Sequence, residues 1–182
     1  FALLSVAFLN DLKRDPQEDW AFIHELAHQW FGWLIPCADF ADFWLNEGFA
    51  TFLVAAVKES RWGSNAFERE VQLWRTRYAK VHEQRRDMPV ALSSPDGSAP
   101  ARLSDSQLQP RGVTYARGAL VLHRLRSELG EACFWAGLRS YVKEYQGRGA
   151  RTEDLRRAME APCHHDLRSF FARWVYAPAP DL

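Results

Sequence analysis

The stretch "HELAHQW" at residues 24–30 constrains the fold of this chain more than any other. It places His24 and His28 four residues apart, with Glu25 directly after the first histidine. On an α-helix, side chains four residues apart lie about 40° apart around the axis and one turn above each other, so both imidazoles can reach one point. Glu25 is rotated from His24 by about 100°, which suits a group facing a metal-bound water better than a ligand. The stretch therefore predicts a helix with two metal ligands and a base.

A third ligand has to come from another element, because a catalytic zinc ion typically takes three protein ligands and keeps one position open. Glu47 in "WLNEGFA" is the best candidate, since it follows His28 after eighteen intervening residues and lies near the start of the next expected helix. Two antiparallel helices joined by a short linker would bring it back to the histidines. The spacing thus predicts one Zn²⁺ per chain, bound by His24, His28 and Glu47, with Glu25 as general base.

The remaining sequence predicts a mainly helical chain. Asp15, Pro16 and Glu18 form a capping-box pattern for the first helix, and Gly130 and Gly147 end two of the later ones. The apolar opening "FALLSVAFLN" predicts a buried strand, and residues 88–112, with four Pro and two Gly, predict a surface loop. Helices are expected over residues 15–33, 42–63, 64–85, 113–129, 131–146 and 152–160, and over "DLRSFFARWVY" near the end.

Composition sets broader bounds. Residues 1–182 are enough for one sizeable domain, and a formal net charge of zero does not favour a nucleic-acid partner. The missing initiator Met indicates that the chain begins inside a larger polypeptide, whose upstream part would be a partner of this domain. Cys37, Cys133 and Cys163 are odd in number and widely spaced, which argues against a disulfide framework and mildly favours a reducing, cytoplasmic location.

The two motifs together resemble a known family. "HELAHQWFG" and "WLNEGFATF", with eighteen residues between His28 and Glu47, look like the zinc aminopeptidases of the gluzincin clan. More narrowly, they resemble the membrane-alanyl-aminopeptidase family, which includes leukotriene hydrolase. The resemblance implies that residues 1–182 are a metallopeptidase catalytic domain, the helical part of a thermolysin-like α+β domain that removes residues from the amino ends of peptides. It gives His24, His28 and Glu47 as zinc ligands and Glu25 as the base.

The resemblance continues downstream. "TYARGALVLHRL" at residues 114–125 is similar to the family's Tyr-x-Lys-Gly segment, with Arg117 in place of Lys. The family's tyrosine stabilises the oxyanion, and its counterpart here is Tyr115. From the residues alone, Tyr115 is an ordinary aromatic residue where a loop meets a helix. The closing "FFARWVYAPAPDL" also resembles the end of the family's catalytic domain.

Three departures from the family pattern stand out. Trp33 replaces the usual Asn after "HQWFG", and Val54 replaces the acidic residue that often lies seven positions after the ligand Glu. Such an acid would be a natural partner for a ligating histidine, a role that Asp39 or Asp42 could take instead. The family's Gly-x-Met-Glu-Asn motif, which reads the substrate's amino terminus, does not occur in this chain.

Two alternatives remain open at this point. In the first alternative, the same zinc site belongs to an endopeptidase or to an epoxide-opening enzyme. In the second, the chain is a non-catalytic zinc-stabilised scaffold or interaction domain, to which Val54 and Trp33 give some weight. The other histidines favour structural roles: His164 and His165 a helix entry, and His123 an apolar helix face.

Overall fold

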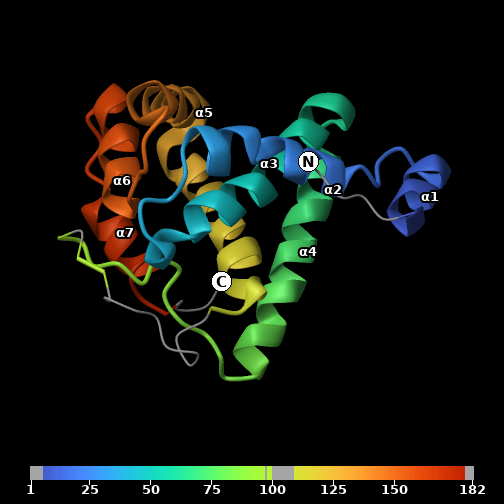
Figure 1. Ribbon diagram of the computed structural model, residues 1–182, viewed down its shortest axis with the longest axis horizontal. Coiled ribbons are helices and arrows are strands. Elements are labelled where there is room, and N and C mark those ends of the chain that lie inside the picture. The colour runs from blue at the N-terminus through green and yellow to red at the C-terminus, as the bar shows by residue number, and fades with distance from the viewer. Residues whose placement is uncertain (1–5, 97, 100–108, 179–182) are drawn as a thin grey trace.

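The structure, a computed structural model, describes residues 6–96, 98–99 and 109–178, and these residues are mainly helical, as predicted (Figure 1). Within those ranges no strand forms, and one isolated parallel bridge pairs Cys37 with Ala150. The α-helices are α1 (Val6–Arg14), α2 (Trp20–Ala27), α3 (Trp44–Trp62), α4 (Ser64–Glu83), α5 (Gly118–Tyr145), α6 (Thr152–Glu160) and α7 (Arg168–Trp174).

The start of the chain differs from the prediction. Residues 6–10 belong to α1 and not to a strand, while residues 1–5 of the expected strand lie outside the described residues. The expected first helix begins at Trp20 and not at Asp15. The side chain of Asp15 accepts a hydrogen bond from the N–H of Gln17 at 2.9 Å, and its carbonyl accepts one from the N–H of Glu18 at 2.9 Å. The capping residues therefore build a turn between α1 and α2.

The segment after α2 leaves regular helical geometry. It continues as the π-helix η1 (Gln29–Leu34), in which Phe31 and Gly32 have non-helical backbone angles. Gly32 has φ 146°, a conformation that favours glycine because a side chain there is strained. This irregular turn bends the chain towards the loop before α3, so the helix predicted over residues 15–33 is shorter and ends differently.

The middle of the chain follows the prediction closely. Helix α3 ends at Trp62 and α4 begins at Ser64, with Gly63 between them at φ 79°. The stretch Phe40–Trp62 is long and apolar enough to cross a membrane, but 67% of its most apolar window is buried inside the fold. That burial is typical of the core helix of a globular protein. The core that contains this stretch has large aromatic side chains that are almost wholly buried: Trp44, Phe49 and Phe52 of the stretch itself, and Trp74, Phe134 and Phe171 from other helices.

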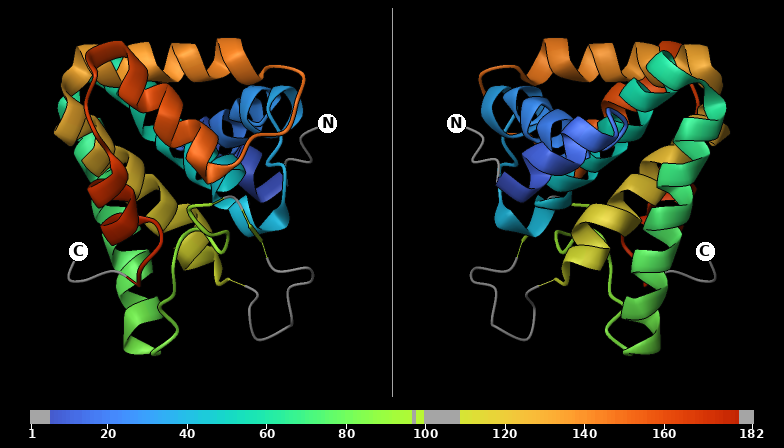
Figure 2. Two further views of the ribbon diagram at one scale, coloured as in Figure 1. Left: turned by 90° about the vertical axis from the view of Figure 1, so that its left-hand side faces the viewer. Right: turned by 90° about the vertical axis from the view of Figure 1, so that its right-hand side faces the viewer.

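Helix α5 consists of the two predicted helices joined at a kink. Gly130, where the first was expected to stop, has φ 73° and ψ 163°. The two halves consequently run in different directions, the first in yellow and the second in orange (Figure 2). The second half is tied to the turn after α6 by a disulfide bond between Cys133 and Cys163. The prediction of no disulfide framework missed this bond, and the cysteines no longer support the expectation of a reducing compartment.

The predicted surface loop over residues 88–112 is partly wrong. Val90 and Ala91 are buried, and their N–H groups donate to the carbonyl of Val175 at 2.9 and 3.2 Å. The loop is anchored by Arg117, whose guanidinium is buried and donates to the carbonyls of Met88, Trp174 and Ala177. The described start of the loop is therefore part of the core, where it packs against the residues at the end of α7.

Candidate metal centre

The structure brings His24, His28 and Glu47 together from two helical elements. The Nε2 atom of His24 lies 3.2 Å from Oε2 of Glu47, and Nε2 of His28 lies 3.5 Å from the same oxygen. One donor atom from each residue falls within 4.8 Å of the others. Donor atoms around a tetrahedral zinc ion at 2.0–2.1 Å are about 3.3 Å apart, so the three side chains fit this metal with small adjustments.

Helix pairing explains the convergence. Helices α2 and α3 are antiparallel, because Asp19 before α2 pairs with Arg61 near the end of α3 at 2.9 Å. The start of α3 therefore returns to the end of α2, where His28 follows Ala27. Close packing of α3 against α5, next to Glu47, also helps to fix the position of Glu47. A Cβ atom on Gly48 would lie 3.2 Å from the backbone of Gly118, so α3 and α5 touch almost backbone to backbone.

The electrostatics of the centre favour a charged carboxylate. Burial alone would raise the pKa of Glu47, but its contacts with the two imidazoles outweigh burial and hold the pKa at about 2. The hydrogen bond to Glu47 in turn raises the pKa of His28, although burial opposes that shift. Glu47 is thus an anion at neutral pH, which is the form that binds a metal cation.

Glu25 lies beside this centre and not in it. Its side chain is exposed, and it lines a cavity of about 440 Å³ that also includes His28 and Glu47. A carboxylate in this position can reach a water or a substrate placed at the metal, as the rotation of about 100° from His24 predicts. Trp33 lines the same cavity, and its side chain is 77% exposed.

Tyr115 reaches the centre from the other side. It lies in the π-helix η4 (Gly112–Arg117), and its ring stacks on His24 with centroids 5.6 Å apart and planes 8° apart. Burial and the neighbouring Glu47 carboxylate raise the pKa of Tyr115 to about 12. The phenol therefore keeps its proton near neutral pH and can donate a hydrogen bond to an oxygen formed at the metal.

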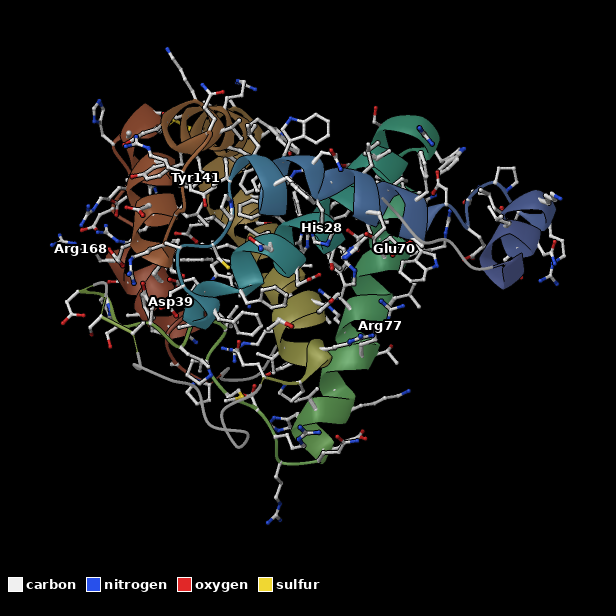
Figure 3. All side chains as sticks on the ribbon, viewed as in Figure 1. His28, Asp39, Glu70, Arg77, Tyr141 and Arg168 are labelled. Atoms are coloured by element: carbon white, nitrogen blue, oxygen red, sulfur yellow. A yellow bond between two sulfur atoms is a disulfide. The ribbon has the colours of Figure 1, made fainter. Side chains whose placement is uncertain are left out.

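The residues proposed as substitutes for an acid at Val54 are used elsewhere. Asp42 accepts hydrogen bonds from Ser93 at 2.5 Å and Thr152 at 2.6 Å, and Asp39 accepts one from the N–H of Ala41 at 2.8 Å. Figure 3 shows Asp39 well away from His28. The printed bonds of both aspartates thus lead away from the histidines: Asp42 joins the α2–α3 loop to α6, and Asp39 caps the short turn Phe40–Asp42.

Two features of the site were not expected from the sequence. The side-chain oxygen of Asn46 accepts a hydrogen bond from the N–H of Cys37 at 3.1 Å, which holds the loop before α3 against the metal centre. Lys58 and Glu70 form a buried ion pair of 2.6 Å between α3 and α4. A lysine on the apolar face of α3 was the available signal for this pair, because Lys58 follows Glu47, Thr51 and Val54 at helical spacing.

The chain is similar in sequence to known peptidases. Residues 10–174 match the model of the peptidase family M1 domain. The chain is 32% identical over 159 residues to aminopeptidase N of Streptomyces lividans, which covers 84% of this chain and 18% of that protein. It is 32% identical over 153 residues to mitochondrial aminopeptidase 2 of Saccharomyces cerevisiae, which covers 84% of this chain and 15% of that one. The chain thus spans less than a fifth of the length of these relatives.

The chain is also similar in fold to solved structures. An M1 zinc metallopeptidase from Deinococcus radiodurans matches with a TM-score of 0.69 at 30% identity, over 90% of this chain and 34% of that chain. Yeast LTA4 hydrolase matches with a TM-score of 0.75 at 20% identity, over 92% of this chain and 27% of that chain, which shows the fold alone. The family match covers most of the chain and includes every residue of the metal centre, so the chain belongs to peptidase family M1.

Proposed function

We propose that this chain carries the catalytic centre of a zinc-dependent peptidase that removes residues from the amino ends of peptides. The observation that supports it most is the convergence of His24, His28 and Glu47 on one point, with Glu25 and Tyr115 on its two sides. The relatives of similar sequence are named aminopeptidases, which favours this use over an endopeptidase or an epoxide-opening enzyme. One Zn²⁺ per chain would be held by the three ligands.

Each remaining residue then has a chemical task. Bound zinc would acidify a water and polarise the scissile carbonyl. Glu25 takes the proton of the attacking water and passes it to the leaving amine. Tyr115 donates its hydroxyl proton in a hydrogen bond to the oxygen that becomes negative during attack. The buried Glu47 supplies the negative charge that balances the metal, since its low pKa keeps it ionised.

The proposal extends to the parent domain. We infer that this helical unit is the helical part of a thermolysin-like α+β catalytic domain in a longer polypeptide. Because the chain spans less than a fifth of its relatives, groups outside it would recognise the substrate's amino terminus. A related M1 zinc metallopeptidase has been solved with a Tyr-Ser-Ala substrate, which supports a peptide as the substrate class.

The test is the Glu25→Gln variant of the full natural polypeptide, with Glu83→Gln on the exposed end of α4 as a control. Hydrolysis of an aminoacyl arylamide should fall by about 10²–10⁴ in Glu25→Gln while zinc content by atomic absorption stays at one per chain. An N-blocked arylamide should be a poor substrate of the wild type. Wild-type rates in Glu25→Gln would remove the base assignment, and zinc without turnover of any peptide substrate would favour a zinc-stabilised scaffold.

A further inference from the structure

The two histidines of the metal centre differ in the hydrogen bonding of Nδ1, the ring nitrogen that faces away from the centre. The Nδ1 atom of His28 lies 3.0 Å from the carbonyl oxygen of Phe31, so this ring is held in place. Because Nε2 of His24 faces Glu47, the Nδ1 atom of the same ring points away from the metal centre. Among the described residues, that atom has no hydrogen-bond partner. Metal-ligating histidines ordinarily donate from the outer nitrogen to an acceptor, which fixes ring orientation and strengthens the ligand.

His24 also lines a second cavity, whose lining does not include His28 or Glu47. Its volume is about 310 Å³, and its lining includes His24, Thr51, Val54, Lys58, Glu70 and Tyr115. Thr51, Val54 and Lys58 follow Glu47 at spacings of four, three and four residues, so they form one stripe along α3. The stripe runs from the metal centre towards the beginning of α2. Val54, which stands where the family often has an acid, lies on this stripe.

Buried polar side chains lie among apolar ones, such as Leu73 and Trp74, in the lining of this cavity. Thr51 is only 6% exposed, and its buried hydroxyl has no hydrogen-bond partner among the described residues. Lys58 and Glu70 are each 7% exposed and pair at 2.6 Å. A buried ion pair is a weak source of stability by itself, because taking both charges out of water costs free energy. A polar cavity of this size with several partners is suited to ordered water.

Glu70 is the buried carboxylate of this cavity. Glu18 also lines it, but its side chain is exposed. Asp19 lies nearby and is already paired with Arg61 at 2.9 Å. Glu70 lies on α4 (Figure 3), and its pairing with Lys58 places it on the side of that helix that faces α3. Lys58 neutralises Glu70 and fixes its direction, which leaves the second carboxylate oxygen available as an acceptor.

We propose that water in this cavity links Nδ1 of His24 to the Thr51 hydroxyl and to Glu70 of the Lys58–Glu70 pair. Glu70 is then a positioning residue: it orients His24 from α4 and takes the role of the acid that is missing at Val54. The inference rests on the proposed zinc site, and it concerns how tightly that site holds its metal. An acceptor on α4 that is reached through water thus replaces an acid on α3 that would contact His24 directly.

The test measures zinc affinity of the full natural polypeptide by competition with a chromophoric chelator. Because Glu70→Gln alone leaves Lys58 buried without its partner, the main variant is the double substitution Lys58→Met/Glu70→Leu, which fills the same space with apolar groups. We expect its zinc dissociation constant to rise by about 10–100-fold, with a thermal unfolding midpoint close to that of the wild type in the metal-free state. Glu68→Gln, on the exposed side of α4, is the matched control and should leave zinc affinity unchanged.

A rescue experiment separates positioning from general packing. Adding Val54→Glu to the double variant supplies a carboxylate directly on the stripe beside His24, and we expect it to recover most of the lost affinity. Wild-type affinity in the double variant, or reduced affinity that Val54→Glu does not recover, would overturn the inference while leaving the zinc site intact. A wild-type protein that binds no zinc would instead overturn the proposed function itself.

Discussion

Tyr115 illustrates how one residue acquires a chemical role from its surroundings. Its ring lies flat on His24, and its hydroxyl faces the carboxylate of Glu47. Burial and the negative charge of Glu47 both oppose loss of the phenolic proton. A phenol that keeps its proton beside a metal site is a hydrogen-bond donor of fixed position, which is what the stabilisation of an oxyanion needs.

Replacing Tyr115 by Phe removes this donor and keeps the stacked ring. We expect kcat on an aminoacyl arylamide to fall by about 10²–10³. Zinc content should stay the same, because the hydroxyl is not a ligand. Steady-state kinetics combined with atomic absorption check both expectations, with Tyr145→Phe as a control remote from the metal centre. An unchanged kcat would show that another group stabilises the oxyanion.

Glu47 makes the metal-free protein sensitive to acid. Its pKa is about 2 in the folded chain against an ordinary value of 4.5. A lowered pKa contributes stability that is present above pH 4.5 and is lost as the pH falls towards 2. With zinc removed by a chelator, the unfolding free energy of the wild type should therefore fall more steeply over this range than that of Glu47→Gln. Urea titrations at several pH values measure this, and parallel pH profiles of the two proteins would contradict it.

At the scale of helices, the contact between α3 and α5 sets the distance between the two halves of the site. Glu47 is followed by Gly48, and Tyr115 is followed three residues later by Gly118. A Cβ atom on Gly118 would lie 3.1 Å from Cα of Gly48, which is closer than side chains normally allow. The two glycines let the element that carries Tyr115 approach the helix that carries Glu47.

The substitution Gly118→Val should push these elements apart. We expect the unfolding free energy to fall by about 1–3 kcal/mol, because inserted methyl groups strain a packed contact. We also expect kcat to fall, because Tyr115 moves away from the metal centre. Ala132→Val on the exposed side of the same helix is the control for the helix propensity of valine. Urea unfolding and arylamide kinetics measure the two effects. Loss of stability with an unchanged kcat would show that the contact only supports the fold.

At the scale of the whole molecule, the disulfide bond fastens the second half of α5 to the turn after α6. It closes a loop with a sequence separation of 30 residues. The buried contacts of Arg117 join the loop after α4 to the end of α7 in a similar way. The disulfide bond and the Arg117 contacts thus hold together two parts of the helical fold that supports the metal centre.

Removing the bond in Cys133→Ser/Cys163→Ser should lower the unfolding free energy by about 2–4 kcal/mol, because the unfolded chain gains freedom. Zinc content should not change, since neither cysteine lies at the metal centre. Cys37→Ser, which alters the free cysteine, is the control. Urea unfolding with and without a reductant provides the measurement. Equal stability of the double variant and the oxidised wild type would contradict the expectation.

Local spacing in the sequence determined a large part of this protein. The four-residue interval between His24 and His28 is a property of one helix, and Gly130 and Thr152 mark helix boundaries because their effects reach only a few residues. The convergence of the three candidate ligands and most helices could therefore be predicted. The strand expected at the start, the helix expected from Asp15 and the exposed loop at Val90 were wrong, because those outcomes depend on competing turns and on packing partners.

Only the tertiary structure decided the rest. It paired Cys133 with Cys163, directed Asp42 to Ser93 and Thr152 and away from the histidines, and placed Glu70 on the cavity behind His24. Each of these contacts joins residues that lie far apart in the chain. Spacing along the sequence carries no information about such contacts, because they follow from how the helices pack against one another. The sequence by itself thus determined which residues can hold a metal, and the packing of the helices decided what holds those residues.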